Sequence, residues 1–262
     1  MELYLEFLTY YNVQFMATTK NVAPAVKTNQ ALTAREFNEQ LTRLASKSEI
    51  ENIKRFYWEN EDSKNKFIGV KWGNVFSLAK KFFGMSLVEI AKLLDSPFYE
   101  VRMGGVSIMD YQAKDKKISA DQKKELFNLY IKKHDRINNW DMVDRSAPYV
   151  VGGYLFDKPR NILYKLAKSK NVWERRTAIV STYFFIRQKD INDTFKIAEM
   201  LLKDKHELIH KAVGSWIREA GKKDKLVLIE FLDQYAATMP RTMLRYAVEK
   251  LDKKEKDFYM KK

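Results

Sequence analysis

The sequence has no cysteine and little glycine or proline: nine glycines and five prolines in 262 residues. Without cysteine the chain cannot form disulfides, iron–sulfur clusters, cysteine-ligated zinc sites or a catalytic thiolate. The scarcity of glycine, with no Gly-x-Gly-x-x-Gly or Walker pattern, disfavours phosphate-binding loops and dinucleotide folds. No apolar run is long enough to cross a bilayer. These absences fit a reducing compartment, and we expect a cytoplasmic protein with no membrane partner.

Negative charge is also in short supply. Lysine and arginine total 48 against 34 aspartates and glutamates, which gives a net charge of +14. Hydrophobic residues make up 45% of the chain, enough to bury a core, so the excess charge belongs to a folded protein. A basic folded domain predicts a polyanionic partner, with nucleic acid first and an anionic membrane surface second. The alternative is a chain that is merely soluble and basic.

The N-terminus differs from the rest of the chain. The first 15 residues are apolar, but Glu2 and Glu6 stand where a signal peptide has basic residues. Residues 17–30 lack periodicity and are typical of a linker. We therefore predict an N-terminal extension over 1–30, disordered or preceding a true start at Met16, and a single domain over 31–262.

Helical signals follow one another from Leu32 onward. Asp157, followed by Pro159, is a candidate cap. Three pairs have capping-box spacing before helical apolar periodicity, Thr33 with Glu36, Ser48 with Glu51, and Ser86 with Glu89. Further helical stretches are predicted over 119–134, 157–169, 171–188, 190–203, 206–221, 224–237 and 240–251. Runs of valine and isoleucine between turns, which indicate a sheet, are missing. The sequence predicts an all-α fold.

Several of these segments resemble one another. They read YEVRMGGV (99–106), WERRTAIV (173–180), LIHKAVGS (208–215) and TMLRYAVE (242–249), each with a basic residue shortly before a small one. The basic residues are Arg102, Arg176, Lys211 and Arg245, spaced by 74, 35 and 34 residues, so one unit is missing near 138–152. This period predicts a HEAT-like helical-repeat solenoid. Its basic residues would line a concave face that suits a phosphate backbone. The alternative is that each one bonds a neighbouring repeat.

The missing unit places an aromatic residue beside a carboxylate. With Asn139 as N-cap, Trp140 and Asp144 stand at i and i+4 and share one helix face. A carboxylate repels phosphate but attracts a cation, such as a purine alkylated at N3 or N7, or the sugar as its glycosidic bond breaks. Trp140 would hold the same cation through its π face. The alternative is that Trp140 packs in the core and Asp144 bonds a neighbouring repeat.

Four segments together resemble the DNA alkylation repair family of AlkD type. They are NNWDMVDRSAPYVVG, WERRTAIVSTYFF, LIHKAVGSWIREAGKKD and MPRTMLRYAVEKL, in that order, and the resemblance runs from about Phe67 to the C-terminus. It implies HEAT-like repeats with a concave DNA-binding surface. It also implies a DNA glycosylase of base excision repair that removes cationic N3- and N7-alkylpurines from double-stranded DNA, without metal, nucleotide or other cofactor and without flipping the base. We accordingly expect a monomer that acts on alkylated bases in the bacterial nucleoid; which lesion it prefers stays open.

The resemblance also implies roles for residues. Trp140 matches the first active-site tryptophan, Asp144 the catalytic aspartate, and Arg176 an active-site arginine that contacts the DNA backbone. Where many members have a second tryptophan this chain has Ser215, and Trp216 follows it, turned by about 100° on a helix. Some relatives show no excision and bind branched DNA. A non-catalytic binder of damaged or branched DNA is therefore the alternative function, whereas a protein–protein solenoid explains the repeats but not the charge.

The remaining predictions concern DNA contacts and metal. Proposed DNA contacts are Arg102, Arg145, Arg175, Lys211, Trp216, Arg241 and Arg245. The run from His206 to His210 imitates the H-E-x-x-H zinc motif, with Glu230 as a conceivable third ligand. Because the match lies inside a repeat and overlaps the family motif Leu-Ile-His-Lys-Ala-Val-Gly, we predict no metal site.

Overall fold

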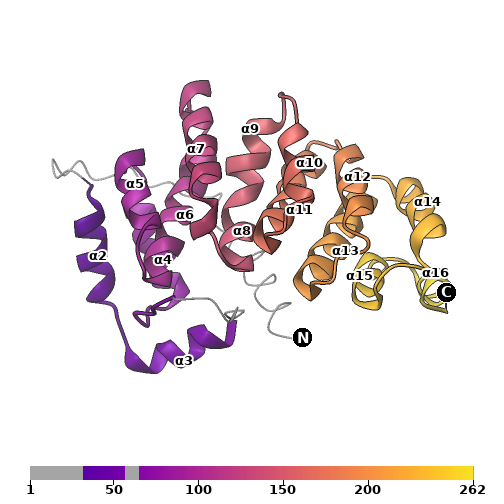
Figure 1. The fold of residues 1–262 in the computed structure, drawn as a ribbon, viewed down its shortest axis with the longest axis horizontal. Coiled ribbons are helices and arrows are strands. Elements are labelled where there is room, and N and C mark those ends of the chain that lie inside the picture. The colour runs from indigo at the N-terminus through magenta and orange to yellow at the C-terminus, as the bar shows by residue number, and fades with distance from the viewer. Residues whose placement is uncertain (1–31, 57–64, 262) are drawn as a thin grey trace.

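A computed structural model of the chain describes residues 32–56 and 65–261. Helices stack side by side along one long axis, from α2 at one end to α14 and α16 at the other (Figure 1). These ranges contain no β-strand, only one isolated bridge between Lys66 and Phe98. The predicted all-α fold is confirmed. None of the described helices combines the length and apolar character that a membrane span needs.

The helices account for most of the described chain. Their bounds are α2 (Ala34–Thr42), α3 (Lys47–Phe56), α4 (Trp72–Lys81), α5 (Leu87–Leu94), α6 (Tyr99–Ala113), α7 (Ala120–Lys132), α8 (Trp140–Ala147), α9 (Gly153–Leu155), α10 (Asn161–Ala167), α11 (Val172–Arg187), α12 (Asn192–Met200), α13 (Glu207–Gly221), α14 (Lys225–Tyr235), α15 (Arg241–Ala247) and α16 (Lys253–Lys261). A 3₁₀ turn, His134–Arg136, precedes α8, and a π-helical stretch, Pro148–Gly152, joins α8 to α9.

Contacts between the helices define two rows. Row B consists of α4, α6, α8, α11, α13 and α15, each of which contacts the next. Row A consists of α5, α7, α10, α12 and α14, each of which packs against a helix of row B. This alternation, in which a helix contacts its neighbours in the stack and little else, is that of a helical-repeat solenoid.

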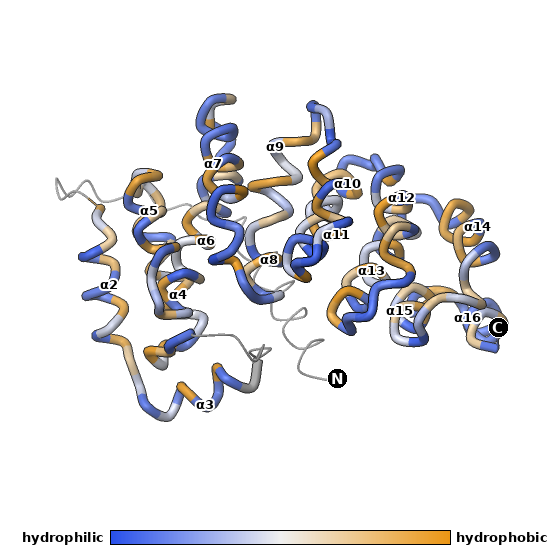
Figure 2. The backbone as a smooth tube through the Cα atoms, viewed as in Figure 1, coloured by the Kyte–Doolittle hydropathy of each residue, from blue (hydrophilic) through white to orange (hydrophobic). Residues whose placement is uncertain are grey.

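Most helices turn an apolar side into a shared core, and α6 and α11 are buried nearly all round. Figure 2 shows hydrophobic and hydrophilic residues alternating along the tube from one end of the stack to the other. Fully buried apolar side chains run through the whole described chain, from Phe37 and Leu41 in α2 to Leu244 and Val248 at the end of α15. The core is therefore a continuous seam between the two rows, as stacked repeats require.

Small residues in the repeated motif let row B pack closely. A Cβ atom on Gly214 of α13 would lie 2.4 Å from the carbonyl oxygen of Met243 in α15. One on Gly152 would lie 2.2 Å from the carbonyl oxygen of Ser181 in α11. Both separations are shorter than van der Waals contact, so the backbones of successive row B helices meet at these points.

Three helix starts lie where the sequence places them. The side chains of Thr33 and Ser86 accept hydrogen bonds from the amides of Glu36 and Glu89, at 3.2 and 3.4 Å. Asn139 caps α8 by accepting from the amide of Trp140 at 2.8 Å. The cap on α8 matters most, since it fixes where Trp140 and Asp144 fall on that helix.

Two predicted caps are wrong. Ser48 lies inside α3, which begins at Lys47. Asp157 does not cap α10, because that helix begins at Asn161 and Asp157 instead pairs with Lys158 at 2.7 Å. Pro159 explains the second error, since a residue that precedes proline is disfavoured in the helical conformation. The predicted extension over 1–30 lies outside the described residues.

Candidate active site

A buried ion pair between α8 and α11 is the centre of the candidate site. The guanidinium of Arg176 donates from Nε and from its terminal nitrogen to the two carboxylate oxygens of Asp144, at 2.8 and 2.7 Å. Arg176 is fully buried, whereas the side chain of Asp144 is 8% exposed. Two parallel hydrogen bonds of this kind fix both the position and the plane of a carboxylate. Asp144 is thus fixed by Arg176 on its buried side, and a small part of its side chain is exposed.

Arg176 also links three consecutive helices of row B. Its remaining terminal nitrogen donates to the carbonyl oxygen of Leu208 in α13 at 2.6 Å. The side chain of Arg176 is therefore fixed between Asp144 and Leu208. That it contacts the DNA backbone, as the resemblance implies, stays a prediction.

Trp140 lies on the same helix as Asp144, one turn earlier. It is 5% exposed and belongs to the hydrophobic core. Asp144 meanwhile bonds the next repeat through Arg176. Both parts of the structural alternative are therefore seen in the molecule. Core packing and the bond to Arg176 do not explain why part of the Asp144 side chain stays exposed.

A second carboxyl lies close to the first and was missed from the sequence. Asp141 is 1% exposed; it accepts a short hydrogen bond from the hydroxyl of Tyr99 and another from the amide of Met142 at 2.8 Å. Burial raises the pKa of Asp141 to about 7, and the negative charge of Asp144 adds to the rise. The i, i+3 spacing of the two aspartates in WDMVD is the signal that could have found it.

Two further residues share one face of α11 with Arg176. Tyr183 and Arg187 follow Arg176 by seven and eleven residues, close to two and three turns of helix, so all three share a face. Trp216 packs on this face: its ring centroid lies 5.6 Å from that of Tyr183, and its indole nitrogen donates to the carbonyl oxygen of Val180 at 3.0 Å. The spacing of Arg176, Tyr183 and Arg187 is visible in the sequence, although only Arg176 was predicted as a site residue.

The change of register at the second tryptophan has a clear structural result. Ser215 is 1% exposed, and its hydroxyl has no hydrogen-bond partner among the described residues. Trp216 is 8% exposed and lies against α11. The indole of Trp216 therefore packs against α11, one residue later than in the motif, and is almost covered.

Three of the predicted DNA contacts are internal. Arg102 is 1% exposed and donates to the carbonyl oxygens of Ser96 and Arg136 at 2.9 and 3.1 Å. Arg145 is 9% exposed and bonded to a buried carboxylate, and Arg175 is held by Asp204 at 2.6 Å. In this structure these arginines join neighbouring repeats, which is the alternative stated for the basic positions.

Of the other predicted cations, Lys211 is covered to the same extent as Arg175, whose side chain is 18% exposed, and two arginines are exposed. Lys211 pairs with Glu207 at 3.0 Å with its side chain 17% exposed. Arg241 is exposed and donates to the carbonyl oxygen of Met260 at 2.8 Å. Arg245 is exposed because α15 is the last helix of row B in the described chain, so no further repeat follows it.

The two histidines of the H-E-x-x-H run have structural roles. His206 is the N-cap of α13, where its Nδ1 accepts from the amide of Leu208 at 3.2 Å. His210 shares a hydrogen bond with the carbonyl oxygen of Asp204, and Glu230 is exposed on α14. Over 32–56 and 65–261, no three histidine, aspartate or glutamate side chains are grouped so that they could hold a metal ion.

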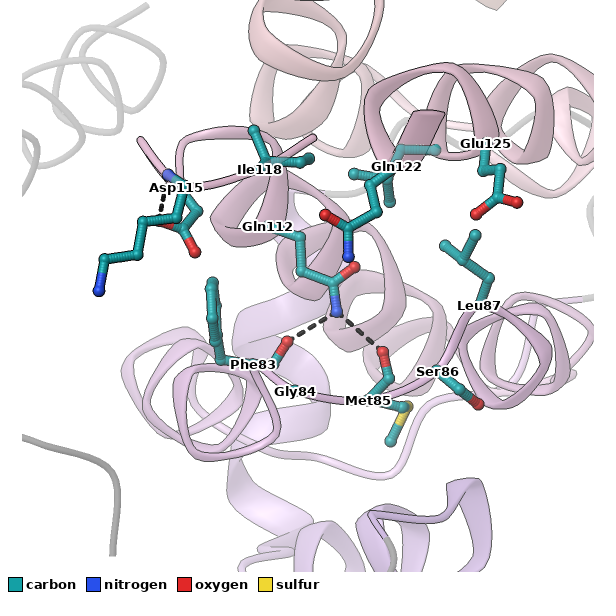
Figure 3. A pocket seen from close by; sticks show the side chains of 12 residues that line it. Phe83, Gly84, Met85, Ser86, Leu87, Gln112, Asp115, Ile118, Gln122 and Glu125 are labelled. Atoms are coloured by element: carbon teal, nitrogen blue, oxygen red, sulfur yellow. Dashed lines mark hydrogen bonds between the residues drawn. The ribbon is translucent and has the colours of Figure 1, made fainter. Parts of the chain in front are cut away.

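A pocket elsewhere in the fold offers no competing site. It lies between the turn after α4 and the α6–α7 corner, and Gln112 spans it by donating to the carbonyl oxygens of Phe83 and Met85 at 2.6 and 2.8 Å (Figure 3). None of the site residues predicted from the sequence lines this pocket. The carboxylate of Asp144 lies instead between α8 and α11, with 8% of its side chain exposed.

Comparison with known proteins identifies a family and a shared fold. The family model described as DNA alkylation repair enzyme matches residues 37–251, and so begins earlier than the resemblance near Phe67. No curated protein matches the chain. A solved structure, a predicted DNA alkylation repair enzyme from Enterococcus faecalis, is similar over 86% of this chain and 100% of that one, with a TM-score of 0.60 and 15% identity. At that identity the likeness shows a shared fold.

Proposed function

Because this chain belongs to the DNA alkylation repair enzyme family, we propose that it is a DNA glycosylase that hydrolyses the N-glycosidic bond of cationic N3- and N7-alkylated purines in duplex DNA. The observation that carries the proposal is the Asp144–Arg176 pair. A carboxylate held by a fully buried arginine, with 8% of its side chain exposed, is suited to meet a cation at a fixed place.

The chemistry needs a negative charge where positive charge develops. When the bond between the sugar C1′ and the purine nitrogen breaks, its electron pair goes to the purine and neutralises the cationic base. The sugar becomes an oxocarbenium ion, which the carboxylate of Asp144 stabilises. Water then adds its oxygen to C1′ and loses a proton, and the same carboxylate orients that water. Arg176 keeps the carboxylate in place throughout.

Surface cations support the duplex as partner. The net charge of +14 gives the chain a long-range attraction for phosphate. Arg241 and Arg245 are exposed near the C-terminal end of the stack, and Lys211 lies between them and Asp144 along row B. We propose these three as contacts to the DNA backbone, and a duplex lying along row B as the arrangement that uses them.

The test is single-turnover release of N7-methylguanine from a defined duplex. We expect release by the wild type and a fall of about 10²-fold or more in Asp144→Asn, the size of effect that loss of one electrostatic stabiliser has in other enzymes. Asp157→Asn is the matched control, because it makes the same chemical change at a carboxylate whose side chain is 75% exposed. Equal release by the wild type and Asp144→Asn would show that the proposed mechanism is wrong.

A second candidate function is a non-catalytic binder of damaged or branched DNA. The observation that favours it is Trp216, whose indole N–H is bonded to Val180 and whose surface is nearly covered, so it presents little face to a lesion. This candidate predicts no release by the wild type with binding intact, and tighter binding to a junction than to plain duplex. Equal affinity for the two DNAs would count against it.

A further inference from the structure

A cluster of charged side chains lies at the C-terminal ends of the row B helices, apart from the Asp144–Arg176 pair. Lys114, which follows α6, places its ammonium 4.5 Å from the ring centroid of Tyr149 in the π-helical stretch. Arg187, the last residue of α11, donates to the hydroxyl of Tyr149 at 2.9 Å. The ends of α6 and α11 and the π-helical stretch between α8 and α9 therefore bring two cations and a phenol together.

The base of this cluster is rigid. Asp110 is fully buried and is shared by Lys114 at 2.6 Å and Arg145 at 3.3 Å. The guanidinium of Arg145 also lies over the rings of Phe76 and Tyr111, at 4.9 and 4.7 Å from their centroids. Stacking and pairing of this kind fix the positions of Arg145 and Asp110, and Asp110 in turn holds Lys114. Arg187 is exposed.

The local charge is positive. Asp110 is one carboxylate near three cations, and burial lowers the pKa of Lys114, with the charges of Arg145 and Arg187 lowering it further. A lowered pKa means that the surroundings disfavour the charged form of Lys114. A nearby anion would favour that form. Ammonium, guanidinium and phenol are all hydrogen-bond donors suited to phosphate oxygens.

The cluster stands in a fixed relation to the proposed catalytic carboxylate. Arg187 and Arg176 share a face of α11 and are eleven residues apart, a rise of about 16 Å. We infer that Lys114, Tyr149 and Arg187 form a second site, which takes one backbone phosphate of the duplex whose alkylated base lies at Asp144. The inference rests on the proposed function in so far as the duplex must lie along row B.

Salt dependence of duplex binding tests the site. The logarithm of the binding constant falls with the logarithm of salt concentration, by about 0.9 for each phosphate neutralised. We expect the slope of Lys114→Gln/Arg187→Gln to be shallower than that of the wild type by about this amount. Lys124→Gln/Lys196→Gln, which removes two exposed cations from row A, should keep the wild-type slope. Equal slopes for the two double variants, or no duplex binding by the wild type, would overturn the inference.

Neutral phosphates then identify the ligand. In duplexes with one methylphosphonate at successive positions, one position should weaken binding by the wild type and leave the Lys114/Arg187 double variant unaffected. If no position does so, while excess inorganic phosphate raises the melting temperature of the wild type alone, the cluster binds free phosphate and the inference is wrong. Should the double variant fail to fold, Arg187→Gln and Tyr149→Phe are read in the same assays, because they leave Lys114 on Asp110.

Release of N7-methylguanine separates this inference from the proposed function. At saturating protein we expect the double variant to release the base at the wild-type rate, because the cluster binds and does not react. A changed slope without any release by the wild type would leave the phosphate site standing and remove the glycosylase proposal.

Discussion

Arg176 and Leu208 lie 32 residues apart and are joined by a hydrogen bond of 2.6 Å from guanidinium to carbonyl oxygen. Arg102 makes the corresponding bond to Arg136, 34 residues along the chain, at 3.1 Å. In both cases a buried arginine of one repeat satisfies a backbone group near the start of the next row B helix. The repeated basic residue thus bonds one repeat to the next, and Arg176 also pairs with the carboxylate of Asp144.

Removing the bonds that Arg176 makes between repeats should destabilise the protein. Arg176→Met leaves the carboxylate of Asp144 without its bidentate partner and the carbonyl of Leu208 without its donor, and breaking a buried pair from one side costs about 3–5 kcal/mol. Urea denaturation measures the change. Arg241→Met, at an exposed arginine, should change the free energy of unfolding by less than about 0.5 kcal/mol. Similar values for the two variants would mean that the pair contributes little.

How far the sequence predicts the molecule depends on what a repeat can encode. The period of the motif was enough for the fold, and the i, i+4 spacing was enough to place Trp140 and Asp144 on one helix face. The period marks a position in a repeat but not the direction of its side chain, so Arg102 was taken for a DNA contact. The direction depends on whether another row B helix follows, as it does for Arg102 and does not for Arg245 in the described chain. That is a property of the stack, which no single repeat contains.

Asp141 should make stability depend on pH. Its pKa is raised from 3.8 to about 7 in the folded protein, so the folded state holds a proton that the unfolded state has lost. The stability this provides is complete below about pH 4 and is lost as pH rises through 7, by up to about 1.4 kcal/mol for each pH unit. Asp141→Asn stays neutral and can still accept from Tyr99 and Met142.

The variant should therefore match the wild type near pH 4 and become the more stable of the two by pH 8, as urea denaturation at a series of pH values would show. Asp157→Asn is the control, because the pKa of Asp157 is lowered by its bond to Lys158 and its contribution has the opposite sign. A difference between Asp141→Asn and the wild type that stays constant over this range would contradict the assignment.

Close packing in row B makes a second prediction on stability. Gly214→Ala would place a Cβ atom 2.4 Å from the carbonyl oxygen of Met243 and 2.6 Å from Cβ of Tyr246, so α13 and α15 must separate. Overpacking of this kind costs about 1–3 kcal/mol. Gly84→Ala is the matched control, since its Cβ would meet only a side-chain carbon of Leu32 at an ordinary 3.5 Å. Thermal melts of both variants check the prediction, which fails if Gly214→Ala melts no lower than Gly84→Ala.

Arg245 should contribute to DNA binding through charge alone. It is exposed on the last helix of row B, where it does not bond one repeat to the next in the described chain. Arg245→Gln should therefore leave the melting temperature unchanged, weaken duplex binding equally for different sequences, and make the salt slope shallower by about 0.9. Arg102→Gln should do the reverse: its guanidinium bonds Ser96 and Arg136 from inside the fold, so melting falls while the slope keeps its value. Fluorescence anisotropy over a range of salt concentrations, with a melt of each variant, separates the two. If Arg102→Gln lowers the slope and Arg245→Gln does not, then duplex DNA reaches the inner repeats by a rearrangement of row B.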